Sequence, residues 1–147
     1  MSKGKMANIF VEGPINSLFI AEKIQQHQAK TAIGAHSIFL GQVRADYINE
    51  QQIQSIEYTS YESMALVKMG EIREAIFAQF DLTCLHVYHS LGEVKAGEIC
   101  LFVFASSKHR KIAIDGCTET VEKIKKELPV WGKEIFVGGN YQWKQNT

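Results

Sequence analysis

The chain has 147 residues, 46% of them hydrophobic and 22% charged, and its 16 basic side chains balance its 16 acidic ones. This length suits one domain with a continuous core. A formal charge of zero argues against a protein that coats nucleic acid or an anionic membrane, because both need a basic surplus. No apolar run approaches the roughly 20 residues of a membrane span, and the chain start has no apolar segment typical of a signal peptide.

Three cysteines, Cys84, Cys100 and Cys117, lie far apart in apolar segments. Their odd number and wide spacing argue against a disulfide framework or a zinc site, and indicate three buried small hydrophobic residues. Without a disulfide framework, the cytoplasm is the expected compartment.

The first half of the chain predicts two further strands after an initial strand and helix. Alternating apolar residues give a short strand that ends at the turn signal Gly13-Pro14. Asn16 or Ser17 can cap the helix that follows. The expected elements of this half are a strand at 8–13, a helix to about 28, a strand at 32–43, a polar turn-rich stretch at 44–52 and a strand at 53–61.

The second half begins with the clearest helix, at 62–80, where apolar residues recur at helical spacing: Met64, Ala65, Val67, Met69, Ile72, Ala75, Ile76 and Phe80. Because strands and helices intermix without strict alternation, we expect a single α+β domain, a sheet with helices packed on it. The remaining predicted elements are strands at 82–92 and 98–107, a helix at 109–128 stopped by a proline, a last strand at 133–139 and a short polar tail.

The segment KIKKELPVWGKE, residues 123–134, places four lysines around a helix end. At about 100° per residue, Lys123 and Lys126 face away from the apolar stripe and Lys125 lies at its edge. Lys125 can extend into water, or its ammonium can sit over a cleft where burial lowers its pKa. Lys133 reaches the same cleft if the chain turns back along the sheet. The stripe consists of Ile114, Cys117, Val121, Ile124 and Leu128.

The segment SSKHR joins a buried strand to the start of the same helix, a junction suited to anions. Ser106 or Ser107 can cap the helix, and His109 and Arg110 add donors that suit phosphate. The alternative is an ordinary capped helix with polar residues in solvent. His109 precedes Lys125 by about 24 Å along the helix, so one chain does not easily bring both to one small ligand.

Arg44 follows a strand and a nearby glycine, where a guanidinium could clamp an anion. The histidines show no metal-ligand spacing with carboxylates or cysteines: His86 and His89, three apart in a strand, point to opposite faces, so we expect no metal site. These residues together predict an α+β domain with an anion pocket, built from Arg44, His109, Arg110, Lys125 and Lys133.

Several of these segments, in this order, resemble the large, catalytic subunit of molybdopterin synthase (MoaE-type) over roughly residues 7–137: GAHSIFLGQVRAD, IEYTSYESMA, HSLGEVKAGE, ASSKHR and KKELPVWGKE. The resemblance implies an α/β-hammerhead type of α+β fold with a mixed or antiparallel sheet. It implies a homodimer that binds two small ubiquitin-like sulfur-carrier subunits, giving a heterotetramer. The implied reaction moves two sulfurs from carrier thiocarboxylates to cyclic pyranopterin monophosphate, forming the dithiolene of molybdopterin without a separate cofactor.

The resemblance also assigns roles to residues of the anion pocket. Gln42, Val43 and Arg44 match a substrate-contacting segment, and His109 and Arg110 match a pair that handles the pterin phosphate. In that family the pocket lies at the dimer interface, so different protomers would supply its two ends.

Lys125 matches a helix lysine regarded as catalytic, and the family's second catalytic lysine falls on Gly132. Lys133 is therefore assigned as the second catalytic lysine after a local shift, with Glu134 beside it in the substrate site; otherwise the chain works with one fewer lysine. Whether Lys144 of the tail reaches a pocket stays open. The alternatives are a non-catalytic relative that binds the carrier or the pterin phosphate, and a small-anion-binding domain of unrelated function.

Overall fold

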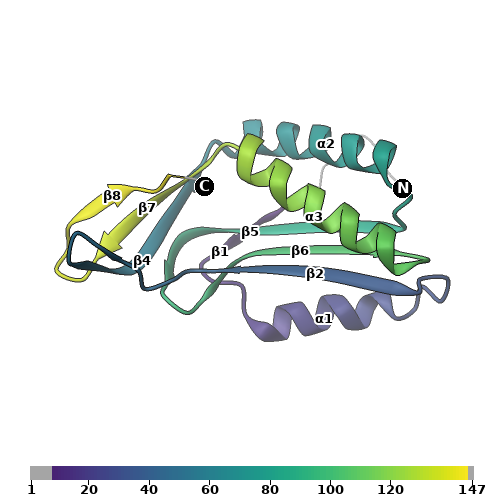
Figure 1. Ribbon diagram of the computed structural model, residues 1–147, viewed down its shortest axis with the longest axis horizontal. Coiled ribbons are helices and arrows are strands. Elements are labelled where there is room, and N and C mark those ends of the chain that lie inside the picture. Colours follow the sequence, from purple (N-terminus) through teal and green to yellow (C-terminus); the bar gives the residue numbers. More distant parts are fainter. Residues whose placement is uncertain (1–7, 146–147) are drawn as a thin grey trace.

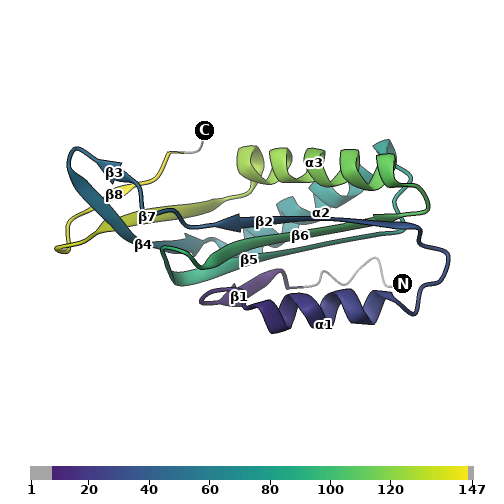
Figure 2. The ribbon, with the colours of Figure 1, turned by 60° about the horizontal axis from the view of Figure 1, so that its bottom comes forward.

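The computed structural model of the chain describes residues 8–145. The basic start of the chain, where we expect no signal peptide, lies largely outside this range. Within it, one mixed sheet carries two helices on one face and one helix on the other (Figures 1 and 2). The described helices are α1 (Ser17–His27), α2 (Glu62–Gln79) and α3 (Arg110–Glu127). None of them has the length and hydrophobicity needed to cross a membrane.

The sheet confirms the α+β class and is mainly antiparallel. Its main path runs β2-β6-β5-β4-β7-β8; β1 pairs with β5 in parallel, and β3 pairs with β4. The eight described strands are β1 (Phe10–Glu12), β2 (Ala35–Gln42), β3 (Tyr47–Ile48), β4 (Gln51–Ser60), β5 (Cys84–Lys95), β6 (Ile99–Ser107), β7 (Val130–Phe136) and β8 (Tyr141–Trp143).

Strand β5 joins two parts of the sheet. Its residues 84–89 pair with β6, whereas residues 92–95 pair with β4. The part formed by β2, β6 and β5 lies between α1 and the α2–α3 layer, and the part formed by β3, β4, β7 and β8 projects beyond the helices (Figure 1). The C-terminal end of α3 therefore meets β4 and β7 where the two parts join.

The main core lies between the sheet and the α2–α3 layer, and its contents confirm most of the predicted helical stripes. On α3 the exception is Ile114, which is 51% exposed. The buried face includes small residues such as Ala113 and Gly116, which allow close packing: a Cβ on Gly116 would lie 3.1 Å from the Leu82 side chain, just before β5. On α2, Met64, Val67 and Ala75 are exposed and were wrongly placed in the stripe. The buried residues of α2 are Ala65, Met69, Ile72 and Ile76.

Two segments predicted to lack strands contain them. The polar stretch 44–52 forms β3 and begins β4, with Asn49 and Glu50 at positive φ in the turn. The polar tail contains β8, whose residues pair with Lys133, Glu134 and Ile135 of β7. Both strands are short and polar, so their structure comes from pairing with a neighbour, which local apolar alternation does not reveal.

Candidate functional site

A cavity of about 190 Å³ lies where the two parts of the sheet meet the end of α3. Tyr58 of β4 and His89 of β5 line it from the sheet, and Lys125 reaches it from α3. Its remaining lining includes Trp131 and Gly132 of β7. Lys144, which follows β8, also lines the cavity. The cavity therefore brings groups from three strands, the segment after β8 and one helix to a single place.

Lys125 faces this cavity, as its place at the edge of the apolar stripe predicts. Burial lowers the pKa of its ammonium group; the charge of Lys144 lowers this pKa further, whereas Cys100 raises it. A lower pKa makes the neutral amine more accessible near neutral pH, which suits a group that accepts and returns protons.

The aromatic side of the cavity consists of His89 and Tyr58, whose rings meet edge to face at 5.1 Å between centroids. Nδ1 of His89 donates a hydrogen bond to the carbonyl of Ser90 at 2.8 Å. Burial, with a contribution from Lys125, lowers the pKa of His89 to about 4, so this imidazole is neutral at neutral pH. Burial also raises the pKa of Tyr58, followed by the effect of Cys100. Both rings thus give the cavity an uncharged wall.

The buried neutral His89 predicts a pH dependence of stability. Its pKa is about 4 in the fold against an ordinary value of 6.5, so only the unfolded chain binds a proton between these values. The free energy of unfolding should therefore fall as pH drops from 6.5 toward 4, with a contribution from this residue of up to about 3 kcal/mol. Urea unfolding across this pH range should show that the free energy of unfolding depends less on pH in His89→Gln than in the wild type. Equal slopes for the two proteins would contradict the assignment.

Lys133 does not share the cavity with Lys125, so the prediction that it stands beside that residue is wrong. Successive side chains of a strand point to opposite faces, and Gly132, its neighbour in β7, holds the cavity side. Nζ of Lys133 instead lies 3.4 Å from Oε1 of Glu57 and 4.7 Å from the ring centroid of Tyr141. A glycine therefore does not shift the strand register, and Lys133 remains on the other face.

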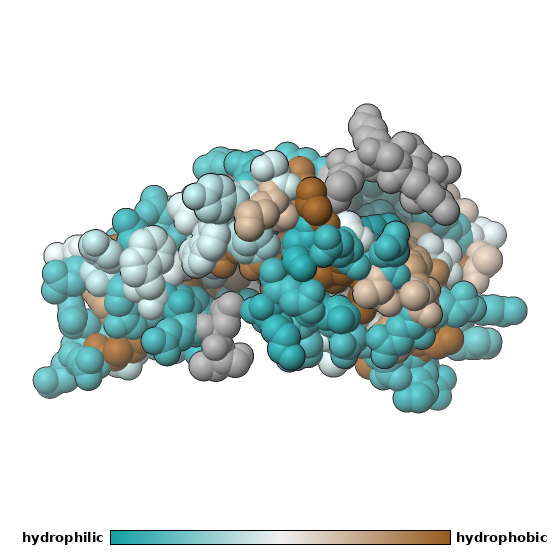
Figure 3. All heavy atoms as spheres, turned by 90° about the horizontal axis from the view of Figure 1, so that it is seen from above, coloured by the Kyte–Doolittle hydropathy of each residue, from teal (hydrophilic) through white to brown (hydrophobic). Residues whose placement is uncertain are grey.

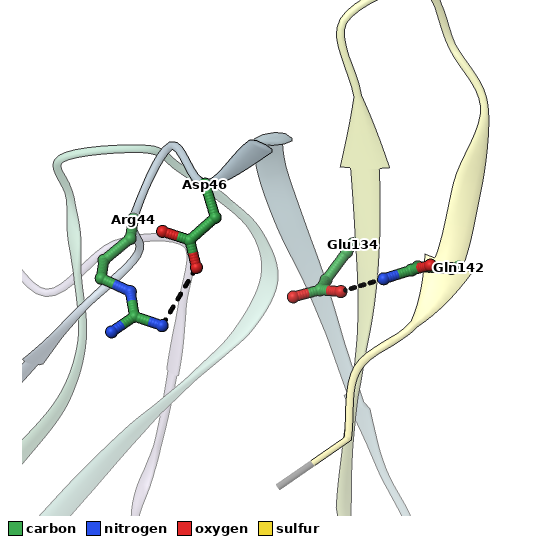
Figure 4. A network of polar contacts seen from close by, with 4 residues as sticks. All are labelled: Arg44, Asp46, Glu134 and Gln142. Carbon is green, nitrogen blue, oxygen red and sulfur yellow. Dashed lines mark hydrogen bonds and ion pairs between the residues drawn. The ribbon is translucent and has the colours of Figure 1, made fainter. Parts of the chain in front are cut away.

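Glu134 lies on the same face of β7 as Gly132 but is 8% exposed, and its Oε1 accepts a hydrogen bond from Gln142 at 2.8 Å (Figure 4). This contact ties β8 to β7. The role assigned to Glu134 in substrate binding stays a prediction, because the structure shows the carboxylate in this pairing.

The predicted substrate-contacting segment, residues 42–44 at the end of β2, lies partly on the surface and partly in the core. Gln42 is exposed, and Nη2 of Arg44 lies 3.0 Å from Oδ2 of Asp46, with the Arg44 side chain 80% exposed (Figure 4). Val43 is 2% exposed, so its side chain is a core contact, and the role assigned to this residue in substrate binding stays a prediction. Its backbone bonds to Glu98 and Gly97 hold the start of this segment in place.

His109 and Arg110 are exposed at the other end of α3, beside a shallow depression that Ile114 also lines. His109 is the N-cap, and its side chain makes no capping hydrogen bond. The predicted caps are wrong: Ser106 and Ser107 are buried in β6, and the Ser107 hydroxyl donates to the carbonyl of His109. One chain therefore keeps this pair and Lys125 at opposite ends of α3.

A group of potential metal ligands that the sequence did not predict lies on the α1 side of the sheet. The ligand atoms of His27, Cys84 and His86 are all within 4.8 Å of one another. Cys84 and His86 are two apart in β5 and so share a face, a signal that the comparison of His86 with His89 overlooked. His27 comes from α1, and no spacing in the sequence relates it to β5.

The prediction that Cys84, Cys100 and Cys117 are buried is confirmed, and all three are free of disulfides.

Comparisons with known proteins agree with the fold. The family model described as "MoaE protein" matches residues 15–127. Named molybdopterin synthase catalytic subunits include one from Drosophila grimshawi, 34% identical over 90% of this chain and 37% of its own length. Another, from Aspergillus fumigatus, is 32% identical over 82% of this chain and 64% of its own length.

Solved structures show the same architecture. Molybdopterin synthase from Staphylococcus aureus superposes with a TM-score of 0.79 at 26% identity, covering 99% of this chain and 98% of that one. A complex of subunits 1 and 2 of molybdopterin-converting factor from Helicobacter pylori superposes with a TM-score of 0.77 at 20% identity, over 92% and 88% of the two chains.

The chain belongs to the MoaE protein family, because the family model covers most of its length. It spans between about a third and two thirds of the length of the curated relatives described above.

Proposed function

We propose that this protein is the catalytic subunit of a molybdopterin synthase, a sulfurtransferase of molybdenum cofactor biosynthesis that acts in the cytoplasm. The observation that carries the proposal is Lys125, a lysine with a lowered pKa held in a cavity of a MoaE-family chain. The substrate is cyclic pyranopterin monophosphate, and the sulfur comes from the C-terminal thiocarboxylate of a small ubiquitin-like carrier. No further cofactor is needed for this chemistry.

Lys125 suits both halves of each sulfur transfer. The thiocarboxylate sulfur attacks a carbon of the pterin side chain and displaces an oxygen substituent, which leaves with a proton as the C–O bond breaks. Water then cleaves the acyl–sulfur bond, leaving the sulfur on the pterin and returning the carrier as a carboxylate. As an ammonium, Lys125 stabilises the oxyanion of the hydrolytic step, and as an amine it accepts the proton that water loses. The uncharged wall of Tyr58 and His89 strengthens these electrostatic effects, because a less polar surrounding screens charge less.

A homodimer would complete the substrate site. His109 and Arg110 offer an exposed phosphate-binding pair about 24 Å along α3 from Lys125, which is too far for one small substrate. Among the described residues β2 ends the sheet path, leaving one of its edges unpaired, and its Ile38 and Leu40 are 38% and 42% exposed. Such an edge is suited to contact with a second copy, so we infer that the partner protomer supplies His109 and Arg110.

The carrier subunits would dock at the cavity mouth and complete a heterotetramer. Large aromatic side chains stand exposed there: Trp131 of the cavity wall meets Tyr61 edge to face at 5.9 Å between centroids. The face with α2 and α3 is otherwise mainly hydrophilic, with a limited hydrophobic strip (Figure 3). Exposed aromatic residues are typical anchors of protein interfaces.

The direct test mixes the purified chain with thiocarboxylated carrier and cyclic pyranopterin monophosphate, and follows molybdopterin through its fluorescent oxidation product. We expect product above a control that contains carrier and pterin without this chain. A stable complex with the carrier but no product would instead identify a non-catalytic carrier-binding relative. Failure to bind the carrier, tested by gel filtration, would favour an anion-binding domain of unrelated function.

A further inference from the structure

Gly132 lets side chains of neighbouring segments approach the backbone of β7 at the place where another residue would put its own side chain. A Cβ on this residue would lie 2.9 Å from Cγ2 of Ile56 and 3.3 Å from Cε1 of Tyr58. It would also lie 3.6 Å from Cβ of Lys144. The space next to Gly132 is therefore already filled from neighbouring strands, and a longer side chain here requires Ile56 to move.

Lys144 occupies the position across from Gly132 on the neighbouring chain segment. The backbone N–H of Lys144 donates to the carbonyl of Gly132 at 2.8 Å, which continues the ladder of β7 with β8. Residues opposite each other in an antiparallel pair present their side chains on the same face. The Lys144 side chain consequently lines the cavity, on the face opposite to that of Lys133.

The charges around the two lysines favour an anionic occupant. Lys144 is close enough to Lys125 to lower its pKa, after the larger effect of burial. Two cations near one half-buried cavity repel each other unless an anion lies between them. The other titratable groups that line the cavity or act on these residues are Tyr58, His89, Cys100, Lys126 and Glu134.

We propose that Lys144 is the second cationic residue of the Lys125 cavity, and that the two ammonium groups together hold the anionic end of the sulfur donor. The thiocarboxylate or carboxylate terminus of the carrier has the size and charge for this place. The inference rests on the proposed function, since it names the group that enters the same cavity.

The test compares Lys144→Gln and Lys144→Arg with Lys133→Gln, a matched change on the opposite face of the same hairpin. In molybdopterin formation, Lys144→Gln should lower kcat/KM by about 10- to 100-fold, Lys144→Arg should retain most activity, and Lys133→Gln should stay near wild type. The pH at which Lys125 titrates in the rate profile should rise in Lys144→Gln, because a repelling charge is gone. An unchanged profile with activity equal to that of Lys133→Gln would overturn the proposal.

A second measurement separates this inference from the proposed function. Calorimetry with the carrier in its carboxylate form reports binding of the tail even if no product forms. If the wild-type protein makes no product, the synthase assignment is removed. If Lys144→Gln nevertheless binds the carrier more weakly than Lys133→Gln does, the role of Lys144 is retained. Equal binding by the two variants would overturn that role.

An independent observation concerns His27, Cys84 and His86. Nδ1 of His27 donates to the carbonyl of Lys23 at 2.7 Å, so its Nε2 carries a lone pair, and this atom lies 2.9 Å from Nε2 of His86. A ligating histidine is usually oriented by such a bond from its other nitrogen. Sγ of Cys84 accepts from Nζ of Lys30 at 3.0 Å, and Lys30 is exposed and free to move into solvent.

We infer that these three side chains form a site for a zinc-class divalent cation, with two nitrogen ligands and one sulfur ligand. Binding requires the Cys84 thiol to release its proton to solvent and the His86 proton to move from Nε2 to Nδ1. Lys30 leaves the sulfur, and the fourth coordination position is open to water.

Titration with Co²⁺, used as a spectroscopic probe for Zn²⁺, tests this site. We expect one ion per chain and a thiolate-to-cobalt absorption band that disappears in Cys84→Ser. The band should remain in Cys117→Ser, a buried cysteine outside the group, and Zn²⁺ should raise the Tm of the wild type more than that of His86→Gln. Absence of the band, or metal binding unchanged in Cys84→Ser, would overturn the inference.

Discussion

Lys125→Ala is expected to reduce molybdopterin formation by about 10²- to 10⁴-fold, the usual effect of removing a proton-transferring group or an oxyanion-stabilising charge. The change removes the half-buried ammonium from the cavity and leaves its aromatic wall in place. The Tm of the variant, measured alongside, shows whether the fold is retained. Single-turnover assays with thiocarboxylated carrier measure the chemical step directly.

Lys123→Ala is the matched control on the same helix. Nζ of Lys123 lies 3.8 Å from Oε2 of Glu127, away from the cavity, in an i,i+4 pair. Such pairs contribute only about 0.3–0.5 kcal/mol, so activity and Tm should both remain near wild type. Comparable activity losses in the two variants would show that general charge on α3, rather than the Lys125 group, supports the reaction.

Phe104→Ala is expected to lower the free energy of unfolding by about 3–5 kcal/mol, because it leaves a large cavity in a filled core. Phe104 is fully buried in β6 beneath α1. Its ring stacks on Phe102 at 5.9 Å between centroids and meets His27 of α1 at 4.8 Å. Removing it therefore loosens the helix from the sheet as well as the core. Urea unfolding followed by circular dichroism gives the loss.

Phe77→Ala makes the same chemical change on α2, where the ring is 37% exposed and its face lies 5.2 Å from the Arg73 guanidinium. We expect a loss of about 1 kcal/mol there. Similar losses at the two positions would mean that the layer between α1 and the sheet is much less tightly packed than the structure shows.

Much of this fold could be predicted from the sequence because the long elements carry their own periodicity. The nearly apolar strand β6 is central, and α2 and α3 lie close to their expected ranges. Ile114 was misplaced because an idealised helical stripe does not reveal that small residues beside it belong to the buried face. Strand β8 was missed because three residues in a polar tail depend on pairing with β7.

Only part of the candidate site could be predicted from the sequence, because helical spacing reveals the direction of a side chain and strand register does not. Lys125 lies on a helix whose buried face can be read from spacing, so its direction followed from the sequence. Lys133 lies in β7 and Lys144 directly follows β8. The direction of both side chains depends on the register of the strand pair, and a shift of one residue reverses the face. The contact between His27 and His86 joins a helix to a strand 59 residues away, and local patterns do not reveal such tertiary approaches.

The pairing of Gly132 with Lys144 shows that a positive charge can occupy one place in the cavity while it comes from a different position in the sequence. Compared position by position with the family resemblance, which places the second catalytic lysine at 132, this chain loses a functional group. Across the β7–β8 pair, however, the cation of Lys144 lines the same cavity. The two positions are thus expected to covary, because side chains at 132 and 144 lie on the same face and point into one cavity. Evolution can in this way move an ammonium group between adjacent strands while the cavity keeps its charge.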